Sequence, residues 1–242
     1  MFLEMRKKPA VTNWNPIFDD QPTSDVPRIR FSGKFSAKYL EKRNFILEIG
    51  CGTGSYTGLI DRRGCFGLDL DLNAIKIAKK YCTSSEFVVA SAFNLPFKKE
   101  IFDLICIWGV FEEIPVGTEK QIIAEVQRTL MPDAVFLLSA YNDHIISKIL
   151  DPAFIFRGIR HYNLKRFVNL ISECGFVVNE YTVRGGLNTL ISNFLFYFYK
   201  HILKKKEANI KNFFDKKSAN EINSSKCGIV YIYIAAYKKE QP

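Results

Sequence analysis

The chain has 242 residues, of which 48% are hydrophobic and 24% charged, and its formal net charge is +9. A chain of this length and composition can fill a large core, which excludes a protein that is disordered throughout. Its cysteines form no C-x-x-C pair, and we find neither a secretory signal nor an apolar stretch of membrane length, so we expect a cytoplasmic protein without disulfides or a metal site.

Residues 1–44 contain several prolines and show little hydrophobic periodicity. Proline interrupts helices and central strands, so we expect an irregular N-terminal arm here. The pattern becomes more regular at the end of this segment, where we predict a short helix over residues 35–42.

A glycine-rich turn follows the first predicted strand, residues 45–49, in the segment ILEIGCGTGSYTGLI. Glycine occupies every second position of this turn, at Gly50, Gly52 and Gly54. Glycine loses more chain entropy on folding than any other residue, and an ordinary strand-to-helix turn usually needs one. We therefore expect a ligand to lie close to this backbone, with a plain tight turn as the alternative.

The spacing of these glycines separates two classes of ligand. The dinucleotide fingerprint G-x-G-x-x-G would need glycine where Ser55 stands. Glu48, just before the turn, would repel a pyrophosphate but could pair with a cationic amino-acid group. The turn thus favours a cofactor with a cationic amino-acid group over a dinucleotide.

Six further strand-like segments alternate with helical patterns along the chain. The strands are predicted at residues 65–70, 86–90, 102–108, 134–140, 176–183 and 228–237, and the helices at 73–82, 118–130 and 163–175. Asp71 is a candidate N-cap and Gly175 a candidate C-cap. Strands this apolar are buried on both faces, so the sequence predicts an α/β fold with a doubly wound, mostly parallel, seven-stranded sheet.

The predicted elements divide the chain into four parts. Residues 1–44 form the arm, residues 45–183 the core, residues 184–227 a helical insertion before the last strand, and residues 228–242 that strand and a tail.

Four segments in order carry a resemblance to a known family. They are LEIGCGTG; GLDLDLNAIKIAKK; ASAFNLPF together with FDLICIWGVFEEIP; and EVQRTLMPDAVFLLSAYN. From about Phe45 to Ala140 the chain resembles the class I S-adenosylmethionine-dependent methyltransferases, and the likeness extends more loosely to Tyr237. The resemblance implies a Rossmann-like methyltransferase fold, S-adenosyl-L-methionine as cofactor and methyl transfer as the reaction.

The resemblance also implies a set of cofactor-binding residues. The glycine turn would approach the amino acid and ribose, Asp69 would accept hydrogen bonds from the ribose hydroxyls, and Trp108 would lie under the methyl end. The alternative roles are a helix N-cap for Asp69 and a core residue for Trp108. Ser91 stands where the family often has an acidic residue that holds the adenine amine. The predicted residues are Glu48, Gly50, Cys51, Gly52, Gly54, Asp69, Leu70, Ser91, Ala92, Phe93, Trp108 and Gly109.

Methyl transfer from a sulfonium is an in-line displacement with a good leaving group, so the family has no universal catalytic residue to transfer onto this chain. The catalytic candidates are Glu113, which stands where related enzymes often place histidine, Tyr141 and His161, with His144 as a further one. An anionic acceptor group could meet Arg157, Arg160 and His161.

Residues 151–242 are strongly basic and contain the segment LNTLISNFLFYFYKHILKKK, residues 187–206. Its apolar side chains recur at helical spacing and predict one continuous amphipathic helix followed by lysines. The apolar positions are Leu187, Leu190, Ile191, Phe194, Leu195, Phe198 and Ile202. Three interpretations stay open: packing on the domain's own core, a homodimer interface, and a peripheral membrane contact at anionic head groups.

The sequence therefore indicates a methyltransferase that acts on a small-molecule, glycan or lipid-linked acceptor. The alternatives are an RNA methyltransferase, suggested by the basic C-terminal part, and a weakly active cofactor-binding scaffold. Nucleic acid is the less expected partner, because no separate RNA-binding module is recognisable.

Overall fold

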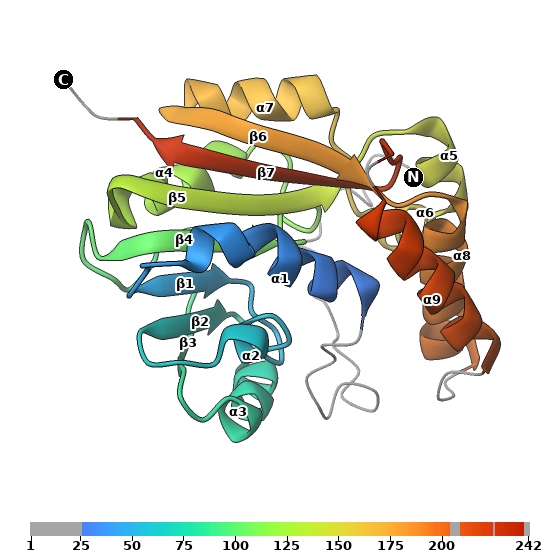
Figure 1. The fold of residues 1–242 in the computed structure, drawn as a ribbon, viewed down its shortest axis with the longest axis horizontal. Helices are drawn as coiled ribbons and strands as arrows, with labels where there is room; N and C mark the ends of the chain where they lie inside the picture. Colours follow the sequence, from blue (N-terminus) through green and yellow to red (C-terminus); the bar gives the residue numbers. More distant parts are fainter. Residues whose placement is uncertain (1–25, 204–208, 225, 240–242) are drawn as a thin grey trace.

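The computed structural model describes residues 26–203, 209–224 and 226–239. Within these residues, seven strands form one sheet in the order β3-β2-β1-β4-β5-β7-β6 (Figure 1). The strands are β1 (Ile46–Ile49), β2 (Cys65–Asp69), β3 (Glu86–Val89), β4 (Phe102–Trp108), β5 (Leu130–Tyr141), β6 (Phe176–Arg184) and β7 (Tyr231–Lys238). β7 runs antiparallel to both β5 and β6, while the pairs from β3 to β5 are parallel. The predicted mostly parallel sheet is confirmed.

Alternate side chains of the central strands enter two separate cores. In β4, Ile105 and Ile107 face a core shared with helices α4 (Glu119–Thr129) and α7 (Leu164–Glu173). Leu104 and Cys106 face the opposite core. The strands are therefore buried on both faces, as their continuous apolar runs predict.

The opposite core is covered by helix α1 (Pro27–Leu40), which crosses the front of the sheet in Figure 1. The predicted helix at residues 35–42 is thus longer and begins earlier. Pro27 lies in its first turn, where a proline ring favours helix entry. Phe31 and Phe35 pack against Tyr233 of β7, with ring centroids 4.8 and 5.6 Å apart. The arm before residue 26 lies outside the described residues.

Two of the predicted helix caps are in place. The Asp71 side chain accepts a hydrogen bond from the Asn73 backbone N–H at the start of α3 (Leu72–Tyr81). Gly175 adopts a φ of +83° just after α7, a conformation that favours glycine. Between β1 and β2 the chain forms only the short helix α2 (Thr57–Ile60).

The insertion before β7 is helical from residue 187 to residue 203, as the sequence predicts, and contains a second helix that the sequence does not predict. The structure has α8 (Leu187–Tyr197), a π-helical segment (Phe198–Leu203) and then α9 (Asn209–Asn223). Residues 204–206 of the predicted helix lie outside the described residues. No helix in the described ranges is both long and apolar enough to span a bilayer.

α8 packs against α9 with hydroxyl side chains on the buried side. Thr189 Oγ1 accepts a hydrogen bond from Ser218 and donates one to Glu221, and Ser192 donates one to Asp215. Leu190 is the one large apolar residue of the predicted stripe that is fully buried among the described positions. Glu221 accepts hydrogen bonds from backbone N–H groups at the start of α8. These polar contacts orient the helix, which explains why most of its apolar stripe is not buried.

Candidate functional site

The carboxyl ends of β1 to β5 meet at one edge of the sheet, where parallel strands commonly build ligand sites. The glycine turn leaves β1 at this edge. Gly50, Gly52 and Gly54 all have positive φ, at 76°, 52° and 82°. A Cβ added at Gly50 would lie 2.2 Å from Val110 Cγ2. The turn thus needs glycine for its own geometry. Gly50 and Gly52 are only half-buried, so the backbone remains accessible to a ligand at these two positions.

Asp69, the last residue of β2, is bonded directly to this turn. Its Oδ2 accepts a hydrogen bond from the Gly52 backbone N–H at 2.8 Å, and its Oδ1 accepts one from the Asp71 N–H at 3.0 Å. Asp71, not Asp69, caps α3. A carboxylate with one bond on each oxygen keeps further lone pairs for two ligand hydroxyls.

Glu48 lies below the turn and is buried. Its Oε2 accepts hydrogen bonds from the Thr57 backbone N–H, at 2.9 Å, and from the Thr57 hydroxyl. Burial raises the pKa of Glu48 to about 8, although the bonds from Thr57 act in the opposite direction. The carboxylate expected to meet a cationic group is therefore also fixed to the start of α2.

The residues predicted around adenine lie at the ends of β2 and β3. Leu70 is 70% exposed, an unusual environment for leucine directly after Asp69. Ser91 Oγ accepts a hydrogen bond from the Phe93 N–H at 3.2 Å, and Ala92 and Phe93 are half-buried against the core below. Cys51 is buried beside α3.

Beyond β4, two charged residues converge on Gly109. A Cβ added at Gly109, whose φ is +74°, would lie 2.9 Å from Arg28 Nη1 and 3.2 Å from Glu112 Oε1. Arg28 Nη1 and Glu112 Oε1 are 3.9 Å apart. Trp108 itself packs in the core, 5.3 Å from the ring of Tyr56 between centroids.

Glu112 is 4% exposed, whereas its neighbour Glu113 is on the surface. Glu112 Oε2 has no hydrogen-bond partner within the part of the chain that the structure describes. Burial raises the pKa of Glu112 to about 7, and the charge of Arg28 limits this rise. The sequence FEEI contains both carboxylates, and only the fold distinguishes them.

Tyr141 and His161 lie together beside this pair. Their rings stack with centroids 5.3 Å apart, and His161 Nε2 is 2.9 Å from Asp151 Oδ2. Tyr231 of β7 lies 5.1 Å from Tyr141 between centroids, and the Arg28 guanidinium lies over the Tyr231 ring. Burial raises the pKa of Tyr141 well above its usual value.

The predicted anion-binding group does not come together in the described residues. Arg160 donates hydrogen bonds to Glu119 and to the Phe111 carbonyl, and His161 pairs with Asp151. The side chain of Arg157 lies outside the described residues. His144 caps α5 (Ile145–Leu150) by accepting from the Ile146 N–H.

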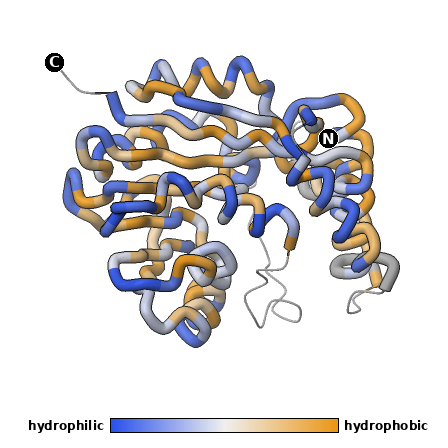
Figure 2. The backbone as a smooth tube through the Cα atoms, in the orientation of Figure 1, coloured by the Kyte–Doolittle hydropathy of each residue, from blue (hydrophilic) through white to orange (hydrophobic). Residues whose placement is uncertain are grey.

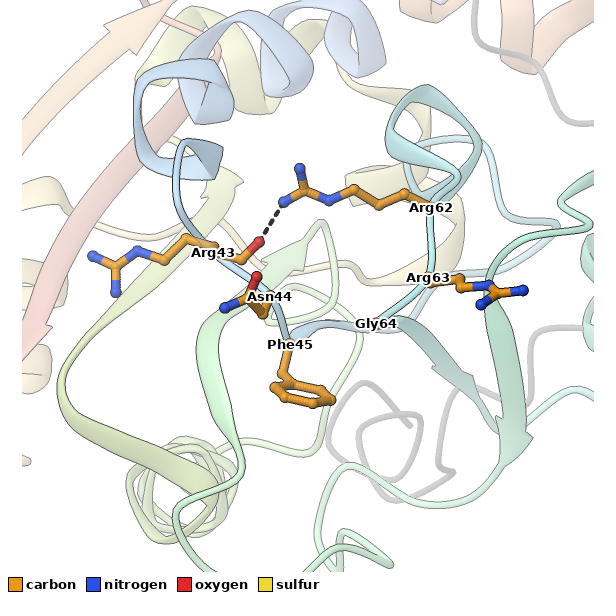
Figure 3. Close-up of a pocket in the computed structure, with 6 residues that line it drawn as sticks. All are labelled: Arg43, Asn44, Phe45, Arg62, Arg63 and Gly64. Atoms are coloured by element: carbon orange, nitrogen blue, oxygen red, sulfur yellow. Dashed lines mark hydrogen bonds between the residues drawn. The ribbon is translucent and has the colours of Figure 1, made fainter.

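A further hollow lies elsewhere. A cavity of about 380 Å³ is lined by Arg43, Asn44, Phe45, Arg62, Arg63 and Gly64 (Figure 3). These residues precede β1 and β2, so the hollow lies at the amino edge of the sheet, opposite the glycine turn. Arg62 donates to the Arg43 carbonyl there, at 2.7 Å. Among the residues described, no three His, Cys, Asp or Glu side chains are grouped closely enough to hold a metal ion.

Comparisons with known proteins identify the central part of the chain. Residues 47–138 match the family model of the methyltransferase domain. An uncharacterized protein of Methanocaldococcus jannaschii is 33% identical over 137 residues, covering 56% of this chain and 50% of that protein. The probable tRNA methyltransferase 9B of Bos taurus is 28% identical over 127 residues, covering 51% of this chain and 26% of that protein. This chain therefore matches half or less of the length of these relatives.

A solved structure shows the same fold. It is a SAM-dependent methyltransferase from Methanosarcina mazei, 20% identical with a TM-score of 0.60, and the match covers 86% of this chain and 98% of that one. The likeness extends well beyond residues 47–138 and supports the arrangement of the whole sheet.

Proposed function

The chain carries a class I S-adenosylmethionine-dependent methyltransferase domain with S-adenosyl-L-methionine as its cofactor, and from this premise we propose that it methylates a small-molecule, glycan or lipid-linked acceptor. One observation carries the proposal most directly. The Asp69 carboxylate is bonded to Gly52 and so joins the ribose-binding position to the glycine turn. This is the arrangement that an adenosine cofactor with a cationic amino-acid end would need.

Each predicted cofactor residue has a role in this proposal. The free lone pairs of Asp69 accept from the two ribose hydroxyls. Leu70 and Phe93 supply apolar walls for adenine, with Ser91 and Ala92 at its edge. Gly50, Cys51, Gly52 and Gly54 bring the backbone to the amino-acid end, and the Glu48 carboxyl, in its ionised form, can pair with the cationic group there.

The methyl end lies towards Trp108 and Gly109, and the acceptor reaches it past Arg28 and Glu112. In the reaction the acceptor atom forms a bond to the methyl carbon, and the sulfonium sulfur keeps the electron pair of the broken bond. The acceptor proton must then leave. A carboxylate whose pKa is about 7 can take that proton near neutral pH, which favours Glu112 for this role. Glu113, Tyr141 and His161 remain candidates, and the stacked Tyr141 and His161 would shape the acceptor pocket.

Two other functions have specific support. The relative from Bos taurus and the basic residues after position 150 favour an RNA methyltransferase. A scaffold that binds the cofactor with little activity is favoured by Ser91, which stands where the family often has an acid. For the acceptor side we also propose a homodimer and a peripheral membrane contact through residues 187–206. The proposed location of the protein is the cytoplasm.

Titration calorimetry with S-adenosylmethionine, S-adenosylhomocysteine and NAD tests the cofactor assignment. Binding of the first two and not of NAD is expected. Release of S-adenosylhomocysteine on addition of metabolites, lipid extracts or tRNA then identifies the acceptor class. If S-adenosylhomocysteine is released only with tRNA, the acceptor is RNA and the proposed acceptor class is wrong. If the cofactor binds but none of the panels causes this release, the scaffold function is favoured.

A further inference from the structure

Three helices near the acceptor end carry large apolar side chains on their outer sides. They are α5, α6 (Pro152–Arg157) and α8. Six of these side chains have exposed fractions between 36% and 67%: Ile145, Ile149, Ile155, Leu187, Ile191 and Phe194. We call this set the apolar helix surface.

The three helices contact one another. α5 touches both α6 and α8, and α6 touches α8. They lie together at the right-hand end of the sheet in Figure 1, and hydrophobic residues recur along them in Figure 2. Segments about 40 residues apart in sequence thus contribute to one region, so the apolar side chains do not result from a single local pattern.

The orientation of α8 is the second observation. A helix that covers its own core normally buries its apolar stripe and exposes its polar side. α8 does the reverse at most positions, because Thr189 and Ser192 are buried against α9 while Leu187, Ile191 and Phe194 are exposed. Hydrogen bonds to Glu221 and Asp215 hold this orientation. An apolar stripe that is held outward implies an apolar partner.

The charges around this surface indicate what that partner is. Residues 144–160 and 187–206 contain one acidic residue, Asp151, which is buried and bonded to His161. The same two segments contain seven lysines and arginines. Lys148 pairs with Asp143 and Arg160 with Glu119, and the side chains of the other five lie outside the described residues. A second copy of the chain would bring these positively charged segments together, and five of the six side chains of the apolar helix surface are aliphatic and offer no stacking surface for RNA bases. Apolar side chains in segments whose sequence carries this excess of positive charge match an anionic lipid surface.

We infer that the apolar helix surface docks on an anionic lipid bilayer and that the acceptor is lipid-linked. The second part rests on the proposed function. α5 begins soon after Tyr141 at the end of β5, and Asp151, between α5 and α6, binds His161, which stacks on Tyr141. The surface is therefore attached to the acceptor end of the sheet. A lipid whose tail stays in the bilayer could present its head group there.

Vesicle flotation of the full chain tests the docking. The probes are vesicles of phosphatidylcholine with phosphatidylglycerol, and vesicles of phosphatidylcholine alone. The wild type is expected to float with the anionic vesicles, and less so at high salt because the ionic contribution is screened. The Ile149→Ser/Phe194→Ser double variant, altered at two exposed positions, should bind anionic vesicles about tenfold or more weakly.

A matched control alters equally exposed apolar residues elsewhere. Val177→Ser/Tyr181→Ser removes two side chains from the edge strand β6 and should float like the wild type. Calorimetry with S-adenosylmethionine is run on all three proteins. Cofactor binding without flotation overturns the docking surface alone, while flotation without cofactor binding overturns the proposed function alone.

The other occupants give distinct results. In one, the wild type does not float and is dimeric by light scattering while the Ile149→Ser/Phe194→Ser variant is monomeric. That result would assign the surface to a second copy of the chain. A tRNA gel shift that only this variant loses, again without flotation, would assign it to RNA. Equal flotation of both double variants would also overturn the inference.

Discussion

The carboxyl edge of the sheet has two halves that are built differently. In the half predicted to hold the cofactor, Gly52 and Asp69 are 17 residues apart and bond directly. In the acceptor half, Tyr233 donates to the carbonyl of Arg28, 205 residues away in sequence. Local segments therefore build the cofactor half, and distant segments must meet to build the acceptor half. Substitutions in the two halves should differ accordingly.

The largest effect is expected in the glycine turn. Gly50→Ala combines a positive φ with a clash against Val110, and should lower the free energy of unfolding by about 2–4 kcal/mol. Gly117→Ala is the matched control, because its φ is +84° and an added Cβ would meet nothing within 4 Å. It should lose only the conformational part, about 1 kcal/mol. Urea unfolding measures both. Equal losses would show that the turn is not tightly packed and would weaken the contrast between the halves.

The acceptor half is tested by its two adjacent glutamates. Glu112→Gln keeps the shape but cannot accept a proton, so turnover should fall by about 10² with cofactor affinity unchanged. Glu113→Gln, at an exposed position, should have a much smaller effect. Steady-state kinetics with the identified acceptor and calorimetry with the cofactor separate the two readouts. The reverse ranking would assign proton removal to Glu113.

A comparable effect on binding is expected for Asp69 in the cofactor half. Asp69→Ala should weaken S-adenosylmethionine binding by roughly 1.5–3 kcal/mol, the range for hydrogen bonds to a charged group. Asp71→Ala, two residues away, removes the α3 cap and should cost about 1 kcal/mol of folding stability without changing cofactor affinity. Calorimetry and thermal unfolding distinguish them. If both variants lose affinity equally, the ribose role of Asp69 is wrong.

The same division explains what the sequence could predict. All seven strands, the Asp71 cap and the glycine turn follow from local patterns, because period, capping and turn chemistry act over a few residues. Arg28 and Glu112 were missed as a pair, since their approach depends on α1 packing across the sheet. The orientation of α8 was also hidden. Its apolar stripe is clear in sequence, but Glu221 and Asp215, which hold the stripe outward, lie on another helix.

The smallest effect is a pH dependence that separates the two buried carboxyls. Folding raises the pKa of Glu48 from 4.5 to about 8 and that of Glu112 from 4.5 to about 7. The folded state then holds more protons than the unfolded state between these values, so each group lowers the stability as pH rises through its window. Both groups contribute from about pH 5 to 7, and Glu48 alone contributes between about pH 7 and 8.

Urea unfolding of the wild type, Glu48→Gln and Glu112→Gln at intervals from pH 5 to 8 measures this difference. Both glutamine variants should flatten the decline of stability below pH 7, since an amide does not titrate. Above pH 7 only Glu48→Gln should do so, by less than the limit of about 1.4 kcal/mol per pH unit for one proton. Folding lowers the pKa of other acidic groups, such as Glu119 and Glu221, so these groups titrate below this pH range. They therefore do not change the slope of stability against pH between pH 5 and 8. A wild-type profile above pH 7 that matches Glu48→Gln would mean that Glu48 is already ionised in the folded protein. Its negative charge would then be available to the cationic end of the cofactor, and the cofactor half would depend on charge as the acceptor half does.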